Sequence, residues 1–227
     1  MRLYREPEEI CMQEGEAPEG AGHAGVSAAA PPAPSPRRYT RALACAGLLL
    51  ALVACAVALL GSSASPQGWA AATRLTARVS ALFFLAAFSA SPLAQLWRGP
   101  ATVWLLRERR GLGLGFCAAH LVHLGAVTGL AMNGEAPGPV ALLGGGLAYL
   151  WMLAMAFTST DRAVQRIGVR RWRALHGAGM YYLWGIFTLS YLGRVMREQV
   201  PFEHALLFTL LLYVLLLRIY QRVYRAR

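Results

Sequence analysis

Apolar residues in this chain of 227 amino acids gather into six blocks that contain no Asp, Glu, Lys or Arg. The blocks are residues 42–60, 79–97, 111–132, 136–160, 174–193 and 205–217. An α-helix rises about 1.5 Å per residue, so roughly twenty residues cross the ~30 Å hydrocarbon core of a bilayer. The pattern predicts an all-α fold, a polytopic membrane helix bundle of about six transmembrane helices in a lipid bilayer.

The sixth block is the shortest of the six. We therefore expect Glu203 and Arg218 to lie near the membrane surfaces, with the Arg218 side chain extending outward to the headgroups. The connections between blocks are short, which makes neighbouring helices antiparallel. Three consecutive glycines, 144–146, are expected to let another helix approach the fourth block closely.

The positive charges are distributed unevenly between the two sides of this predicted bundle. The net charge is +11, which could suggest a protein that binds nucleic acid, but the arginines lie between the apolar blocks, so we expect no nucleic-acid partner. The opposite loops hold only Arg74, Arg78, Arg194 and Arg197. The positive-inside rule then places both termini and the region around 162–173 in the cytoplasm of a bacterial inner membrane protein. Most arginines fall on that side, namely Arg37, Arg38, Arg41, Arg98, Arg107, Arg109, Arg110, Arg162, Arg166, Arg170, Arg171, Arg173, Arg218, Arg222, Arg225 and Arg227.

The chain divides into three parts by composition. Residues 1–38 are rich in Glu, Gly, Ala and Pro and predict a disordered cytoplasmic tail. Residues 39–220 hold the transmembrane domain, and residues 221–227 form a basic cytoplasmic end.

Three histidines fall within the apolar blocks: His120, His123 and His176. An imidazole in hydrocarbon is costly unless it has a partner inside the bundle, so such residues are candidates for function, and neutral imidazole is a common ligand of haem iron. The alternative is a structural role, in which each ring makes a hydrogen bond to a neighbouring helix. The four cysteines form no Cys-x-x-Cys-His motif, so any haem would be held without a covalent link.

Several short motifs resemble one family of membrane proteins, the ferric reductase-like transmembrane family. Residues 109–114 read Arg-Arg-Gly-Leu-Gly-Leu and precede His123, and residues 172–176 read Trp-Arg-Ala-Leu-His. Both are similar to motifs at the third and fifth helices of the haem-binding membrane subunit of the bacterial periplasmic methionine sulfoxide reductase system. Further similarities, in the same order along residues 42–217, are Thr76-Ala77-Arg78, Ser91-Pro92-Leu93, Thr158-Ser159 and Ile167-Gly168.

The resemblance implies a b-type haem held between histidines of the third and fifth helices, and these match His123 and His176. His120 is an additional candidate ligand. A second histidine of the fifth helix is usual in the family, and its position here is Leu189. His123 lies thirteen residues beyond Arg110, about 20 Å deep, and His176 only three beyond Arg173, about 5 Å deep. A residue near 189 would therefore match the depth of His123 better than His176 does.

The resemblance also implies a function, the transfer of electrons from a quinol or a flavoprotein across the membrane to a periplasmic acceptor or partner reductase. The chain shows no Gly-x-Gly-x-x-Gly fingerprint after a predicted strand, so we expect no flavin or nicotinamide domain in it. The missing histidine at Leu189 supports an alternative, a haem-free membrane scaffold or assembly protein of the same fold. A small-solute transporter is a third hypothesis. Many transporters are built from inverted repeats, and the chain shows no clear ones.

Overall fold

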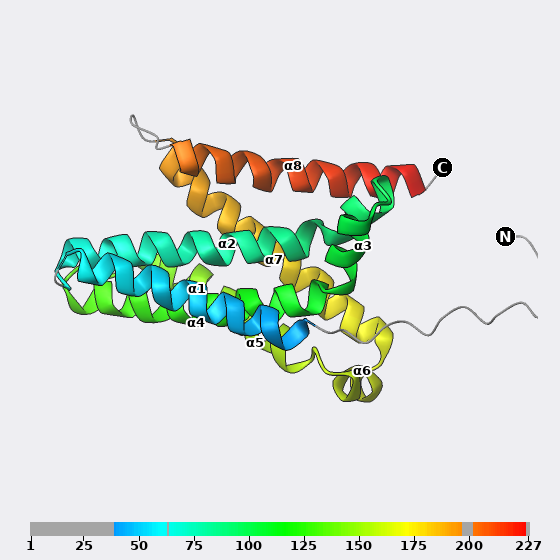
Figure 1. The fold of residues 1–227 in the computed structure, drawn as a ribbon, viewed down its shortest axis with the longest axis horizontal. Coiled ribbons are helices and arrows are strands. Elements are labelled where there is room, and N and C mark those ends of the chain that lie inside the picture. Colours follow the sequence, from blue (N-terminus) through cyan, green and yellow to red (C-terminus); the bar gives the residue numbers. More distant parts are fainter. Residues whose placement is uncertain (1–38, 63, 197–201, 226–227) are drawn as a thin grey trace, which may run out of the picture. The chain divides into compact units, whose positions relative to one another are not determined.

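The computed structural model describes residues 39–62, 64–196 and 202–225. This part of the chain forms α-helices and no β-strand. The prediction for the tail, residues 1–38, falls outside the described residues. Six long helices correspond to the six apolar blocks: α1 (Thr40–Leu60), α2 (Pro66–Leu96), α4 (Arg109–Met132), α5 (Pro139–Phe157), α7 (Val169–Val195) and α8 (Phe202–Arg225). The all-α prediction is confirmed (Figure 1).

Five of these helices, α1, α2, α4, α5 and α8, are long and apolar enough to cross a membrane. α8 is among them although its charge-free block is the shortest, because the helix continues beyond both Glu203 and Arg218. α7 does not meet the same criterion, although its 27 residues would extend about 40 Å. The protein is thus a multi-pass membrane helix bundle, while the count of six spans and their orientation stay predictions.

Two short helices lie in connections for which the apolar pattern predicted no helix. α3 (Pro100–Arg107) begins with a proline, whose fixed φ suits the first helical position, and the Thr102 hydroxyl accepts from the Gly99 N–H at 3.1 Å. α6 (Asp161–Ile167) is capped by the Thr160 hydroxyl, which accepts from the Ala163 N–H at 3.1 Å. Neither helix has a buried residue, so an apolar-block criterion does not detect them.

α2 is the helix around which the others are arranged. It packs along α1 and α4, which lie side by side with it, and α8 lies against another part of its surface (Figure 1). Its buried phenylalanines, Phe84 and Phe88, contact each other at 5.3 Å between ring centroids, and Phe84 also contacts Phe116 of α4 and Phe187 of α7. This aromatic cluster joins three helices in the core.

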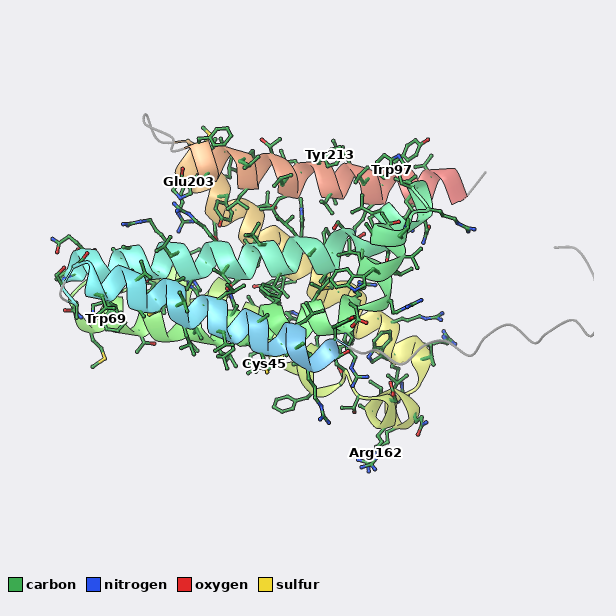
Figure 2. All side chains as sticks on the ribbon, in the orientation of Figure 1. Cys45, Trp69, Trp97, Arg162, Glu203 and Tyr213 are labelled. Atoms are coloured by element: carbon green, nitrogen blue, oxygen red, sulfur yellow. The ribbon has the colours of Figure 1, made fainter. Side chains whose placement is uncertain are left out.

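The helix α2 begins thirteen residues before its charge-free block. Ser65 caps it by accepting from the Gly68 N–H at 3.3 Å, and Pro66 takes the first helical position. Arg74 and Arg78 therefore lie within α2 and not in a loop, which corrects the prediction from the charge pattern. Arg78 pairs with Glu203 at 2.7 Å, and Figure 2 shows Glu203 at the beginning of α8.

A proline within α2 leaves one backbone carbonyl without its helical partner. Pro92 has no N–H, so the Phe88 carbonyl cannot accept the usual hydrogen bond from four residues later. Arg218 of α8 donates to this carbonyl from both Nε, at 3.0 Å, and Nη2, at 2.7 Å. Its guanidinium also lies over the Phe88 ring, 3.9 Å from the centroid. The expectation that Arg218 extends outward to the headgroups is therefore wrong, because the side chain is held inward by α2.

Helix contacts made through glycine lie mainly between α1 and α4. Gly111 and Gly115 of α4 face α1, and a Cβ on Gly115 would be 2.7 Å from the Leu43 carbonyl oxygen. Of the three glycines at 144–146, only Gly144 meets another helix, through Ile186 and through a hydrogen bond from the Tyr182 hydroxyl to its carbonyl at 3.1 Å. A Cβ on Gly145 or Gly146 would meet nothing within 4 Å, so the expected close approach is confined to Gly144.

Candidate functional site

Two of the candidate histidines form a pair on α4. His120 and His123 are three residues apart, which puts them on nearly the same face of the helix, and their ring centroids are 5.1 Å apart. His120 is buried and His123 is partly buried. Because both rings project from one face of one helix, only one of them can approach a given side of a single metal ion.

Aromatic rings from three helices surround His120. Tyr149 of α5 stacks on it at 4.8 Å, while Phe116 and Phe187 lie at 5.2 and 5.7 Å. The Tyr149 hydroxyl donates to the His120 carbonyl at 2.9 Å and so fixes α5 to α4. The Nδ1 atom of His120 is buried and has no hydrogen-bond partner among the described residues. A buried polar atom of this kind is uncommon and leaves a nitrogen available to a ligand.

His123 is bound to α2. Its Nδ1 atom lies 3.0 Å from Oγ1 of Thr76, a residue with no exposed surface. The ring also makes a hydrogen bond with the backbone of Thr73 on the same helix. Both contacts hold the imidazole of His123 against α2.

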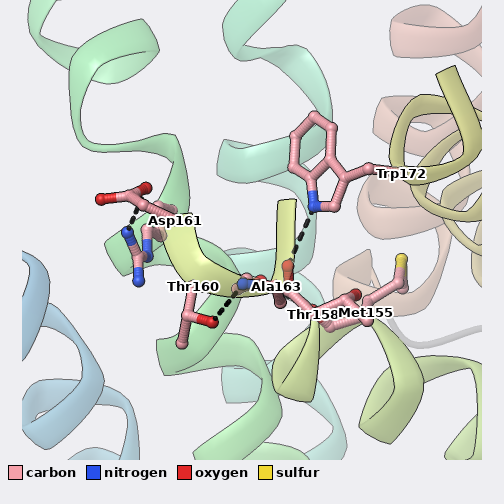
Figure 3. A network of polar contacts seen from close by, with 8 residues as sticks. Met155, Thr158, Thr160, Asp161, Ala163 and Trp172 are labelled. Atoms are coloured by element: carbon pink, nitrogen blue, oxygen red, sulfur yellow. Dashed lines mark hydrogen bonds and ion pairs between the residues drawn. The ribbon is translucent and has the colours of Figure 1, made fainter. Parts of the chain in front are cut away.

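His176 lies at the turn that joins α5 and α7 through α6. Its Nε2 atom is 3.2 Å from Oγ1 of Thr158, and its ring is 4.3 Å from that of Trp172. Trp172 in turn donates from Nε1 to the Thr158 carbonyl at 3.0 Å (Figure 3). Arg110 of α4 reaches the same turn through its 3.3 Å contact with Asp161. These bonds hold the beginning of α7, where His176 lies, against the end of α5.

The structure does not bring His176 together with the histidine pair of α4. The residue of α7 that contacts His120 is Phe187, eleven residues beyond His176. Eleven helical residues correspond to about 16 Å along α7. Two axial ligands of one iron must lie close to the metal on opposite sides, so in this arrangement His176 and the α4 pair do not face a common ion.

The part of α7 at the level of the pair offers no second imidazole. Leu189 is 66% exposed and points away from the core, and the Thr188 hydroxyl donates to the Trp184 carbonyl at 2.8 Å. Tyr191 is buried, and its ring lies 6.0 Å from that of His204 at the beginning of α8. The Nδ1 atom of His204 is also buried without a partner among the described residues.

The site places imidazole nitrogens in an apolar, aromatic surrounding. Among the residues that the structure describes, no group of three or more His, Cys, Asp or Glu side chains converges on a common point. This arrangement does not suit a metal ion held by protein ligands alone. It suits a planar group that brings most of its own ligands and needs one or two imidazoles.

The hydroxyl groups that hold these histidines could not be identified from the sequence. Thr76 and Thr158 occur in the motifs that carry the family resemblance, yet nothing in those motifs shows which ring nitrogen each one binds. A threonine in or near an apolar block is a weak signal, because threonine often bonds only to its own helix.

Comparison with known proteins gives one group of relatives. The chain is 33% identical over 134 residues to the protein-methionine-sulfoxide reductase heme-binding subunit MsrQ of Klebsiella pneumoniae, covering 51% of this chain and 63% of that protein. The subunits of the same name from Salmonella arizonae and Salmonella paratyphi B are also 33% identical over 134 residues, with 64% of each covered. The match therefore spans less than two thirds of these relatives. No protein-family model and no solved structure matches the chain.

The family resemblance seen in the motifs is therefore confirmed. Over about half of its length, this chain is similar to curated relatives named as the heme-binding subunit MsrQ.

Proposed function

We propose that this protein is a membrane-embedded, haem-binding electron-transfer subunit that works with a methionine sulfoxide reductase. Three observations support the proposal: the relatives are named as heme-binding subunits of that reductase, the fold is a multi-pass membrane helix bundle, and the core contains imidazoles with free nitrogens. The observation that carries it is the pair His120 and His123, which presents such nitrogens inside an aromatic enclosure.

The residues of the α4 pair fit haem in their chemistry. His123 is held against α2 through Nδ1 by Thr76, and His120 has a buried, unpartnered Nδ1. Phe116, Tyr149 and Phe187 supply the flat apolar surfaces that a porphyrin needs. When bound, haem supplies one-electron redox chemistry, and the protein tunes it through ligands, hydrogen bonds and burial.

The ligands that we propose are His123 first, with His120 and His176 as the other histidines of the site. His176 is about 16 Å along α7 from the level of His120, so a role for it in binding the same iron requires α7 to shift relative to α4. Its place beside Arg110, Asp161 and Trp172 supports a role near the cytoplasmic side.

The finer features of the proposal come from the resemblance to the ferric reductase-like family. By that resemblance the haem is of b type, and the chain has no Cys-x-x-Cys-His motif for covalent attachment. By the same resemblance electrons come from a membrane quinol or a flavoprotein, and no nicotinamide or flavin fingerprint occurs in the chain. They pass across the bacterial inner membrane to a periplasmic reductase partner.

An absorption spectrum of the purified protein tests the proposal. Protein made with an ample supply of haem should show a Soret band that shifts on reduction with dithionite. His123→Ala should remove most of that band, while His204→Ala, at the beginning of α8, serves as the matched control. A wild-type protein without a Soret band would exclude the proposed function.

One observation favours a second candidate, a haem-free scaffold or assembly protein of the same fold. The residue of α7 that faces His120 is Phe187, and the position of the usual second histidine, Leu189, is exposed. For such a protein the spectrum would stay featureless, and substitution of His123 would affect only stability or assembly with a partner.

A further inference from the structure

The contact between Thr76 and His123 joins two buried groups from different helices. Thr76 on α2 has no exposed surface, and its Oγ1 atom is 3.0 Å from Nδ1 of His123 on α4, 47 residues later in the chain. The ring also makes a hydrogen bond with the backbone of Thr73, likewise on α2. The hydroxyl of Thr76 is the side-chain group that meets a ring nitrogen of His123 there.

The direction of this hydrogen bond follows from the second bond of Thr76. A hydroxyl group has one hydrogen to donate and two lone pairs that accept. The Thr76 hydroxyl lies 2.7 Å from the Ala72 carbonyl oxygen, which can only accept, so its hydrogen is engaged there. Toward His123 the same oxygen accepts. The proton of His123 is thus on Nδ1, and Nε2 carries the lone pair.

The corresponding contact of His176 involves the other ring nitrogen. Thr158 donates to the Ala154 carbonyl at 2.7 Å, so its oxygen also accepts from an imidazole, but the nitrogen that it meets is Nε2 at 3.2 Å. His176 therefore holds its proton on Nε2 and its lone pair on Nδ1, the nitrogen nearer its own backbone. Two threonines with the same local hydrogen bond present the two histidines through different nitrogens.

We infer that Thr76 is a positioning residue that fixes His123 as an iron ligand through Nε2. The inference rests on the proposed function and deepens it. A ligating histidine commonly donates its second N–H to an acceptor, which fixes the tautomer and ring orientation and makes the imidazole a stronger donor. Thr76 provides that acceptor for His123, whereas Thr158 occupies the nitrogen of His176 that extends farthest from its helix.

The expected effects separate Thr76 from a residue that only packs. Thr76→Val keeps the shape of the side chain but removes the acceptor, so haem affinity should fall by about tenfold or more. The imidazole also becomes a weaker donor to ferric iron, so the midpoint potential of the haem that remains should rise. Thr76→Ser keeps the hydroxyl and should match the wild type in both measurements.

The experiment compares the whole protein with these two variants and with Thr128→Val by haem titration and spectroelectrochemistry. Thr128 lies on the same helix as His123, and its exposed hydroxyl donates to the Leu124 carbonyl of that helix, so Thr128→Val should leave the potential unchanged. Equal potentials and affinities for wild type and Thr76→Val would overturn the inference while leaving the proposed function intact. A larger effect of Thr128→Val than of Thr76→Val would also overturn it.

A second measurement separates this result from a failure of the proposed function. The ¹⁵N spectrum of histidine-labelled, haem-free protein reports the tautomer of His123, assigned by comparison with His123→Gln. The Nδ1-protonated form is expected in the wild type and in Thr76→Ser, and a mixture in Thr76→Val. An Nε2-protonated His123 in the wild type would overturn the inference whether or not the protein binds haem. A wild type that binds no haem would remove the ligand role together with the proposed function.

Discussion

Gly47 of α1 and Gly115 of α4 touch backbone to backbone. A Cβ on Gly47 would overlap the carbonyl group of Gly115, and a Cβ on Gly115 would be 2.7 Å from the carbonyl oxygen of Leu43. Small residues at such a crossing let two membrane helices approach closely, and packing is a main source of their association in lipid.

We expect Gly47→Ala to destabilise the bundle by about 1–3 kcal/mol, because neither backbone can move aside without disturbing the rest of the α1–α4 contact. Gly113→Ala is the matched control, since a Cβ there meets nothing within 4 Å. Unfolding of the purified protein by SDS in mixed micelles measures the difference. Equal stability of the two variants would contradict the close contact.

The pairing of Pro92 with Arg218 predicts a coupled effect on stability. Arg218→Met leaves the buried Phe88 carbonyl without its two donors and should cost about 1–3 kcal/mol. In a Pro92→Ala background the helix regains its own N–H for that carbonyl, so the same Arg218 substitution should cost less. A double-mutant cycle by SDS unfolding measures the coupling. Additive costs would show that Arg218 acts independently of the proline.

Trp172 contributes to the turn at His176 in two separable ways. Trp172→Phe keeps an aromatic ring against His176 but removes the N–H that donates to the Thr158 carbonyl. We expect a loss of about 0.5–1.5 kcal/mol in the free energy of unfolding. Trp104→Phe is a suitable control, because Trp104 is 41% exposed and makes no side-chain hydrogen bond within the described part of the chain. A loss as small as that of the control would mean that the N–H bond adds nothing.

The arginine distribution predicts the side of the membrane on which α6 lies. Arg162→Cys, in a chain whose native cysteines are replaced by serine or alanine, should react with a membrane-impermeant maleimide only after the inner membrane is opened. A cysteine in place of Glu135, in the α4–α5 connection, should react in intact spheroplasts. Labelling of position 162 from the outside would reverse the predicted topology.

Much of the fold could be predicted from the sequence, since each of the six charge-free blocks coincides largely with part of a long helix. The helix ends could not be predicted in this way. A charge-free block marks only the part of a helix that contains no charge, whereas α2 begins at its Ser65 cap and includes Arg74 and Arg78. The direction of Arg218 also depends on tertiary structure, because its acceptor is 130 residues away on α2.

For the candidate site, the sequence gives residue types and depth along each helix. The difference in depth between His123 and His176, estimated from the flanking arginines, agrees with the contact between His120 and Phe187. The sequence does not show which nitrogen of each histidine faces Thr76 or Thr158, because that choice depends on the rotamers and packing of four helices. The unpartnered nitrogens of His120 and His204 likewise appear only in three dimensions.

The Phe88 carbonyl has a consequence for how the chain assembles as it is synthesised. Its donor, Arg218, is 130 residues farther along, on the last of the described helices. When α2 enters the bilayer, this carbonyl has no protein donor until α8 has been made and has docked. The helix α2 therefore completes its hydrogen bonding only after α8 has inserted, so the correct docking of α8 stabilises a helix segment made 130 residues earlier.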